Sequence, residues 1–232
     1  LGGGVVRFVR LEGGAGRFGH RGVGLIGECD RLGDRLECSG LTLRIQLGRI
    51  VGHVDVLDVF ASSGGFALAA AAGGARSVHL VDSSAAALAT AERNLAHNHR
   101  LREVRDCTVR TTVGDAFEVL EQLSARDDRD RFDLIVVDPP SFAQNQANVE
   151  RALRAYARLT RLAVVLLRRN GLLVQASCSS RVATDAFFDT VHEAAVHAGR
   201  RLHEIRRTAH PLDHPVTFEQ GAYLKAIFAR VT

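Results

Sequence analysis

The sequence predicts an α/β fold, a parallel sheet with helices on both faces, and three observations support it. From His53 onward, apolar strand-like runs alternate with helix-like segments. Two of these runs, VDVLDVF (54–60) and FDLIVVD (132–138), are too apolar for a half-exposed strand and are typical of a sheet covered on both sides. The 232 residues, 46% hydrophobic and 24% charged, suit one large globular domain or one domain with a small appendage.

The first 50 residues differ from the rest. They contain 13 of the 22 glycines and short alternating runs such as VVRFVRLEG and GVGLIGECD. Runs of this kind, bounded by glycine and aspartate, predict a small antiparallel hairpin or meander. We therefore divide the chain into a β appendage over 1–50 and a main domain over 51–232.

Seven strands are expected in the main domain, each an apolar or alternating run next to a turn signal. They lie at 54–60, 77–82, 108–115, 132–138, 172–177, 202–209 and 222–231. The helices between them follow from alanine-rich or amphipathic segments, and Ser83 or Ser84 would cap the second. These helices are expected from the glycine turn to about residue 72, and at 84–98, 117–123, 147–168 and 183–199.

Ligands of such sheets bind beyond the carboxyl ends of the strands. The first strand is followed by Gly64 and Gly65, which allow a tight turn and a close approach of the backbone to a ligand. This pair is not the GxGxxG fingerprint of dinucleotide enzymes, so a dehydrogenase is disfavoured. Many α/β proteins have a glycine pair here, and the pair alone does not identify a ligand site.

Two carboxylates follow the second and third strands. Asp82 lies 24 residues after Asp58, where an acidic side chain can accept the two hydroxyls of a ribose. Asp115, in Gly114-Asp115-Ala116, would face an adenine amine. The alternative is that both aspartates cap the helices that follow them. Acidic residues at successive strand ends favour an adenosyl ligand without a pyrophosphate.

The fourth strand ends in VDPPSFAQN (137–145). Pro139 and Pro140 lack backbone donors and stiffen the chain as it leaves the sheet, so Asp138 would point into the cleft. Phe142 would stack on a planar ring, and a rigid, acidic, aromatic segment suits a flipped-out base. The alternative is a stiff turn with a core phenylalanine.

Cys178 follows the fifth strand in GLLVQASCSSR (171–181). A free cysteine is often a buried, inert residue. Strands four and five are expected to be neighbours, which would place Cys178 beside Asp138 and Phe142. The position therefore favours a nucleophile over a core residue.

Composition narrows the classes of function. No apolar run approaches the roughly 18 to 20 residues needed to span a membrane, and no CxxC or HExxH spacing indicates a metal site.

Of 30 basic residues, 29 are arginine and the net charge is +4. Arginine suits phosphate recognition, so RNA is a candidate partner, although coding bias explains the same excess. We expect a protein of the cytoplasm or an organellar matrix, and a chain that begins at Leu1 suggests further residues upstream.

The sequence resembles class I S-adenosylmethionine-dependent methyltransferases, and among them the RlmI-type cytosine-C5 methyltransferases of large-subunit ribosomal RNA. The resemblance runs from about Val54 to the end of the chain. It is carried by LDVFASSGGF, VDSSAAALATAERNLAHN, VGDAFEVL, FDLIVVDPPSFA, GLLVQASCSS and LDHPVTFEQGAYLK. It implies a Rossmann-like seven-stranded sheet, S-adenosylmethionine as cofactor, and RNA or a pre-ribosomal particle as partner.

The resemblance also implies roles for individual residues. Cys178 would be the nucleophile that adds to cytosine C6 and activates C5, which splits one difficult step into two. Asp138 would position the base or assist proton transfer, and Pro139, Pro140 and Phe142 would contact the substrate. The cofactor pocket would be lined by Asp58, Phe60, Gly64, Gly65, Asp82, Ser83, Asp115, Ala116 and Asp138.

The chain departs from the family pattern in three ways. It shows no PUA-type RNA-binding domain and no KTG…DQR-like segment before the first strand, and Ser62 stands where the family has a tyrosine. Two alternatives to the active C5 enzyme remain open. One is a degenerate methyltransferase that serves as a ribosome-assembly or RNA-binding factor. The other is an amino-methyltransferase of RNA or DNA, in which Cys178 would be dispensable.

Overall fold

The computed structural model describes residues 54–125, 132–143, 145–209 and 223–232. The expected appendage over 1–50 lies outside these residues, so the division of the chain at residue 50 stays a prediction. None of the helices in the described ranges is long and apolar enough to cross a membrane.

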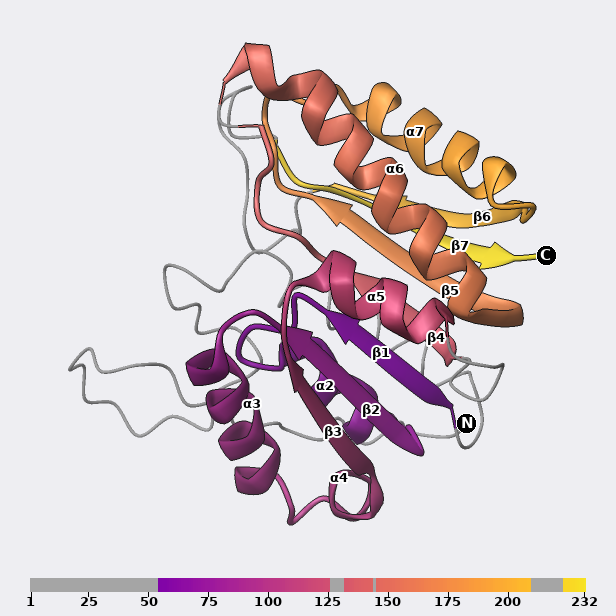
Figure 1. The fold of residues 1–232 in the computed structure, drawn as a ribbon. Helices are drawn as coiled ribbons and strands as arrows, with labels where there is room; N and C mark the ends of the chain where they lie inside the picture. Colours follow the sequence, from indigo (N-terminus) through magenta and orange to yellow (C-terminus); the bar gives the residue numbers. More distant parts are fainter. Residues whose placement is uncertain (1–53, 126–131, 144, 210–222) are drawn as a thin grey trace.

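The described strands form one seven-stranded sheet in the order β3-β2-β1-β4-β5-β7-β6 (Figure 1). The chain order reverses direction between β1 and β4, which is the topological switch point where ligands of such sheets bind. The strand bounds are β1 Asp55–Val59, β2 Ser77–Asp82, β3 Thr108–Val113, β4 Phe132–Val137, β5 Leu167–Ser177, β6 Leu202–Thr208 and β7 Lys225–Val231.

Helices connect the strands at nearly the predicted positions. A short helix, α4, was not predicted, and a 3-10 turn, η1, precedes α6. The bounds are α2 Gly65–Ala72, α3 Ala85–His97, α4 Arg102–Asp106, α5 Ala116–Ala125, η1 Gln146–Asn148, α6 Val149–Leu166 and α7 Thr184–His197.

Two details differ from the sequence-based expectation. β7 runs antiparallel to both β5 and β6, so the sheet is mixed rather than wholly parallel. No helix-like segment was predicted between the last two strands, and parallel neighbours need such a crossover whereas antiparallel neighbours do not. In addition, β5 begins at Leu167, where Leu167 pairs with Phe132, so the residues after Leu166 continue as strand instead of helix.

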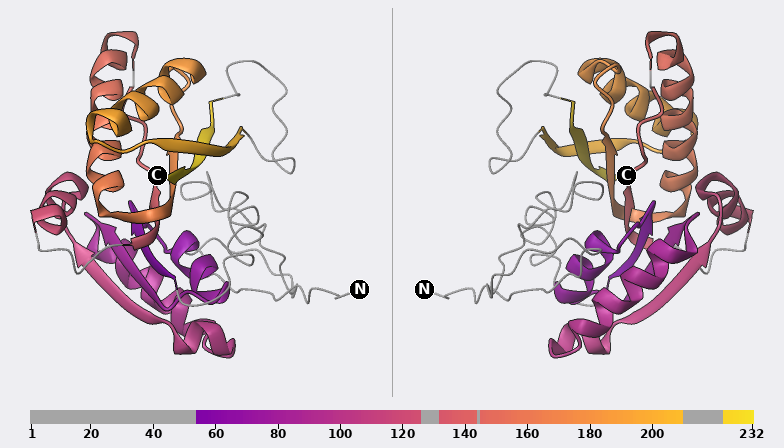
Figure 2. Two further views of the ribbon diagram at one scale, coloured as in Figure 1. Left: turned by 90° about the vertical axis from the view of Figure 1, so that its right-hand side faces the viewer. Right: turned by 90° about the vertical axis from the view of Figure 1, so that its left-hand side faces the viewer.

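The sheet is covered on both faces, as predicted, and alternate residues of each strand point to opposite sides. Val56 and Leu134 pack with α2, α3 and α4, whereas Leu57 and Ile135 pack with α5, α6 and α7. Figure 2 shows the two helical layers from the side. The predicted fold class, a Rossmann-like α/β sheet with helices on both faces, is therefore confirmed.

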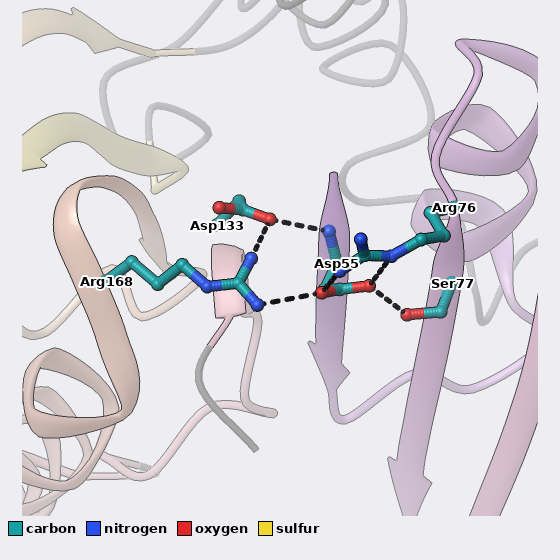
Figure 3. Close-up of polar contacts among 5 residues, drawn as sticks. All are labelled: Asp55, Arg76, Ser77, Asp133 and Arg168. Atoms are coloured by element: carbon teal, nitrogen blue, oxygen red, sulfur yellow. Dashed lines mark hydrogen bonds and ion pairs between the residues drawn. The ribbon is translucent and has the colours of Figure 1, made fainter. Parts of the chain in front are cut away.

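An ionic network joins β1, β4 and β5 at their amino ends (Figure 3). Arg168 pairs with Asp133 and Asp55, and Arg76 pairs with Asp55 from the other side. Ser77 Oγ donates to Asp55 Oδ1 over 2.6 Å. Burial opposes ionisation of Asp55, but the hydrogen bonds from Arg76, Ser77 and Arg168 prevail and lower its pKa to about 2. The network therefore lies at the amino ends of the strands, opposite the carboxyl ends where the candidate site is found.

Candidate active site

The loop between β1 and α2 is the first component of the site. Its backbone is left-handed at Phe60 (φ 65°), Ser62 (φ 49°) and Gly64 (φ 80°). The amides of Phe60 and Ala61 donate to the carbonyl of Val81 at the end of β2, at 2.9 and 3.1 Å. Positive φ at non-glycine residues costs energy and is concentrated at functional sites.

Gly64 is required by space as well as by conformation. A Cβ at this position would lie 2.7 Å from Cβ of Ala91 on α3, closer than atoms of two real side chains approach. The loop can therefore be held tightly against α3, and Asn94 of the same helix donates to the carbonyl of Ser63 over 3.0 Å. Gly65 opens α2 directly behind this turn.

Asp82 connects the loop to α3. Its Oδ2 accepts from the amide of Ser62 and its Oδ1 from the amide of Ser84, both at 2.8 Å. Ser84 caps the helix, since its Oγ accepts from the Ala87 amide, and both Ser83 and Ser84 are exposed. An ionised carboxylate has about four acceptor positions, so these bonds leave room for ribose hydroxyls. Asp82 thus anchors both elements and keeps acceptor capacity.

Asp58 is buried at the end of β1. Its Oδ2 accepts from the amide of Ala67 in α2 over 3.0 Å, while its Oδ1 is buried with no hydrogen-bond partner among the described residues. Burial raises the pKa of Asp58 to about 7, the charge of Asp82 adds to the rise, and the Ala67 bond opposes it. A buried acceptor without a partner is the kind of atom that a ligand donor would satisfy. The glycine loop, Asp58 and Asp82 therefore fit an adenosyl cofactor.

Asp115 has the helix-cap geometry that the sequence left as an alternative. Its Oδ1 accepts from the amides of Phe117 and Glu118 at the start of α5, at 2.9 and 3.2 Å. The residue is exposed and its neighbour Ala116 is buried. A cap does not exclude a contact with an adenine amine, because the second carboxylate oxygen is not used by the cap.

The ends of β4 and β5 meet, as expected for neighbouring strands. The Cys178 thiol donates to the carbonyl of Pro139 over 3.8 Å, and Ser179 Oγ donates to that of Ala143 over 3.4 Å. The amide of Asp138 donates to the carbonyl of Val59 over 3.3 Å, which holds the DPP turn (138–140) against β1. Cys178 is 8% exposed. The structure thus places the cysteine against the DPP turn, more deeply buried than an openly displayed nucleophile.

Tyr156 of α6 lies beneath this junction. It is fully buried, and its hydroxyl donates to Ser177 Oγ over 2.9 Å. Burial raises the pKa of Tyr156 to about 12, with further contributions from Cys178 and Asp138. Cys178 and Asp138 are thus both close enough to this hydroxyl to affect its ionisation. Sequence reasoning did not identify Tyr156.

Phe142 is part of an aromatic cluster. Its ring centroid lies 5.3 Å from that of Tyr156, 6.4 Å from Phe117 and 6.5 Å from Phe60. The side chain is half-buried against the α5–α6 face. Pro140 next to it is exposed, whereas Pro139 is buried. Phe142 therefore packs on the core while keeping part of its surface open.

Lys225 is a second residue that sequence reasoning missed. It begins β7, pairs in register with Ser177, and is 4% exposed. Its Nζ donates to the carbonyls of Ser179 and Tyr223, at 2.7 and 3.3 Å. The sequence did contain a signal that could have singled out Lys225. It is the single lysine among 30 basic residues, and one lysine is unusual in a composition so biased to arginine.

Comparison with known proteins gives the family and the fold. The family model described as "Conserved hypothetical protein 95" matches residues 44–184. A ribosomal RNA large subunit methyltransferase from Deinococcus radiodurans is 40% identical over 176 residues, 76% of this chain and 42% of that protein. A ribosomal RNA large subunit methyltransferase I from Shewanella amazonensis is 40% identical over 190 residues, 81% of this chain and 46% of that protein. The chain thus spans less than half the length of these relatives.

Solved structures agree on the fold. SMU.776, a putative methyltransferase complexed with SAH, superposes with a TM-score of 0.68 at 24% identity and covers 84% of this chain and 49% of its own. A SAM-dependent methyltransferase from Agrobacterium tumefaciens has a TM-score of 0.60 at 19% identity and covers 85% of this chain and 61% of its own. The predicted resemblance to RlmI-type proteins is confirmed by the sequence relatives, and the predicted fold by these structures.

Proposed function

This chain belongs to the Conserved hypothetical protein 95 family and has a class I methyltransferase fold, and from these premises we propose that it is an S-adenosylmethionine-dependent RNA methyltransferase domain. The relatives named as ribosomal RNA large subunit methyltransferases support RNA of the large ribosomal subunit as the substrate. Such a substrate places the activity in the cytoplasm or an organellar matrix. No membrane partner is proposed.

In this proposal the loop after β1 would hold the cofactor. S-adenosylmethionine supplies an electrophilic methyl group when bound. Asp82 accepts the ribose hydroxyls with the acceptor capacity left by its two amide bonds. The Oδ1 of Asp58, which has no hydrogen-bond partner in the described part of the chain, would accept a donor that the ligand or a bound water brings. The remaining cofactor-lining residues are Phe60, Gly64, Gly65, Ser83, Asp115, Ala116 and Asp138.

We further propose that the product is 5-methylcytosine. The single observation that carries this step is the contact between the Cys178 thiol and the Pro139 carbonyl, which puts a sulfur at the DPP turn beside the proposed cofactor site. The thiolate adds to C6 of the cytosine, and electron density moves to C5, which then takes the methyl group. S-adenosylhomocysteine would leave as the methyl group is transferred, and the C5 proton would then pass to a base or water as the thiolate is expelled from C6, which restores the aromatic ring. Pro139, Pro140, Phe142 and Asp138 hold the base.

Methyl transfer to large-subunit ribosomal RNA tests the proposal. The protein is incubated with the RNA and S-adenosylmethionine carrying a labelled methyl group, and the product nucleoside is identified by mass spectrometry. Cys178→Ala is expected to abolish methylation and leave cofactor binding intact. Cys107→Ala is the matched control, because Cys107 is also buried but lies between α4 and the edge strand β3, which β2 and β1 separate from β4.

The other outcomes separate the alternatives. Full activity of Cys178→Ala with a methyl group on an exocyclic nitrogen would refute the C5 chemistry and indicate an amino-methyltransferase. Absence of cofactor binding at millimolar concentration in the wild-type protein would refute the enzyme altogether and indicate a scaffold or RNA-binding role.

A further inference from the structure

Lys225 has no role in the proposed function so far, although it lies next to the proposed nucleophile. It is the one lysine of the sequence. In the antiparallel pair β5–β7 it stands opposite Ser177, the residue before Cys178. Its ammonium donates to the carbonyl of Ser179, the residue after Cys178, over 2.7 Å. One residue of β7 therefore holds the chain on both sides of the cysteine.

The charge of Lys225 is poorly balanced by its hydrogen bonds. The side chain is 4% exposed, and the carbonyls of Ser179 and Tyr223 are neutral acceptors. Within the described part of the chain, no ion pair includes Lys225. A buried cation without a counter-charge is costly, which favours a nearby group that can become negative.

The sulfur of Cys178 is such a group. Burial lowers the pKa of Lys225, and the interaction with Cys178 opposes this by favouring the charged ammonium. The interaction is mutual, so the ammonium favours the ionised form of the cysteine by the same Coulombic attraction. The thiolate, rather than the thiol, is the nucleophile.

Among the described residues, Asp138 and Tyr156 also lie at this junction. Asp138, at the end of β4, would oppose a second negative charge nearby. Tyr156 of α6 stays neutral, since its pKa is about 12. The Lys225 ammonium therefore acts on the Cys178 sulfur with the opposite sign to the Asp138 carboxylate.

We propose that Lys225 is a positioning residue for the reaction at Cys178: it fixes the turn that carries the sulfur through the Ser179 carbonyl, and its ammonium favours the thiolate. This role rests on the proposed function, since it serves a reaction in which Cys178 attacks the base. Arginine would keep the charge but would replace the compact ammonium by a planar fork that fits the Ser179 carbonyl differently.

Alkylation of individual cysteines tests the role directly. Wild-type protein, Lys225→Gln and Lys225→Arg are treated with iodoacetamide between pH 6 and pH 10, and the labelled peptides are quantified by mass spectrometry. At pH 7, Lys225→Gln is expected to slow labelling of Cys178 by about tenfold, which corresponds to a displacement of about one pH unit in the rate profile. Lys225→Arg should recover part of the rate, and Cys107 should label equally in all three proteins. Equal labelling of Cys178 in wild type and Lys225→Gln overturns the proposal.

A second measurement does not require replacing Lys225. Because the sequence contains one lysine, protein labelled with ¹⁵N-lysine gives a single side-chain Nζ resonance, and its pKa can be followed by NMR. The Cys178→Ser variant removes the ionisable sulfur, so the pKa of Lys225 should fall below its wild-type value. An identical titration in both proteins overturns the proposal even if Lys225→Gln does not fold.

The methyl-transfer assay separates this inference from the proposed function. If Cys178→Ala remains fully active, the C5 chemistry fails, and the role of Lys225 in it fails with it. If Cys178 is essential but Lys225→Gln shows the wild-type rate and the wild-type pH profile, the C5 chemistry stands and only the role of Lys225 is refuted.

Discussion

The replacement Asp58→Asn is expected to stabilise the cofactor-free protein at neutral and higher pH. The Asp58 carboxyl is buried, one of its oxygens has no hydrogen-bond partner among the described residues, and its pKa is raised to about 7 from an ordinary value of 3.8. The folded protein therefore holds a proton that the unfolded chain releases, between about pH 4 and pH 7. Stability is retained below the unfolded pKa and falls as the pH rises through this interval.

The size of the effect follows from the shift. One pKa unit corresponds to about 1.4 kcal/mol, so the full rise would cost about 4 kcal/mol above pH 7. Relaxation and water entry reduce such penalties at real buried sites, and we expect about 2–4 kcal/mol. An asparagine oxygen can still accept from the Ala67 amide, and the substitution changes neither size nor shape appreciably.

Urea unfolding of both proteins without cofactor, at half-unit steps from pH 4.5 to pH 8.5, measures the difference. The free energies of unfolding should be similar near pH 4.5 and diverge in favour of Asp58→Asn as the pH rises, because all other titrating groups cancel in the comparison. Parallel profiles would show that Asp58 ionises in the folded protein as easily as in the unfolded chain, and the assignment of a buried, unpartnered carboxyl would be wrong.

Three further changes test other parts of the structure. Asp82→Ala should weaken S-adenosylmethionine binding by about 1–3 kcal/mol through loss of charge-assisted bonds; calorimetric titration measures it, and unchanged affinity would refute the ribose contact. Gly64→Ala should destabilise the protein by about 1–3 kcal/mol in thermal unfolding, because a left-handed residue gains a Cβ 2.7 Å from Ala91. Adding Ala91→Gly should recover part of the lost stability. A Gly64→Ala protein as stable as wild type would contradict the close packing of the loop against α3. Asp55→Asn should lower the free energy of unfolding by about 1–2 kcal/mol at pH 7, a value discounted for solvent screening. The loss should become smaller as the pH falls from 4 towards 2, because the pKa of Asp55, about 2, lies below its value in the unfolded chain. A constant difference in urea unfolding across that range would refute the network in Figure 3.

Much of the fold and part of the site follow from local patterns. The continuous apolar runs around Leu57 and Ile135 marked strands buried on both faces, and the structure has β1 and β4 at the centre of the sheet. The glycine pair and Asp82 were recognised because parallel strands end at one edge, so residues that follow them in sequence meet in space. Such features depend on a strand and the few residues after it, which is the range over which periodicity and turn chemistry act.

Contacts between distant segments were decided by the tertiary structure. The reversed direction of β7 depends on its insertion between β5 and β6, and no local pattern specifies a neighbour. That insertion brings Lys225 to Ser179 across a separation of 46 residues, and Tyr156 reaches Ser177 only because α6 lies over β5. Burial and Coulomb interactions fall off with distance through space, not along the chain. The sequence by itself therefore determined which residues stand at the strand ends, and only the packed sheet determined which charges and hydroxyls surround Cys178.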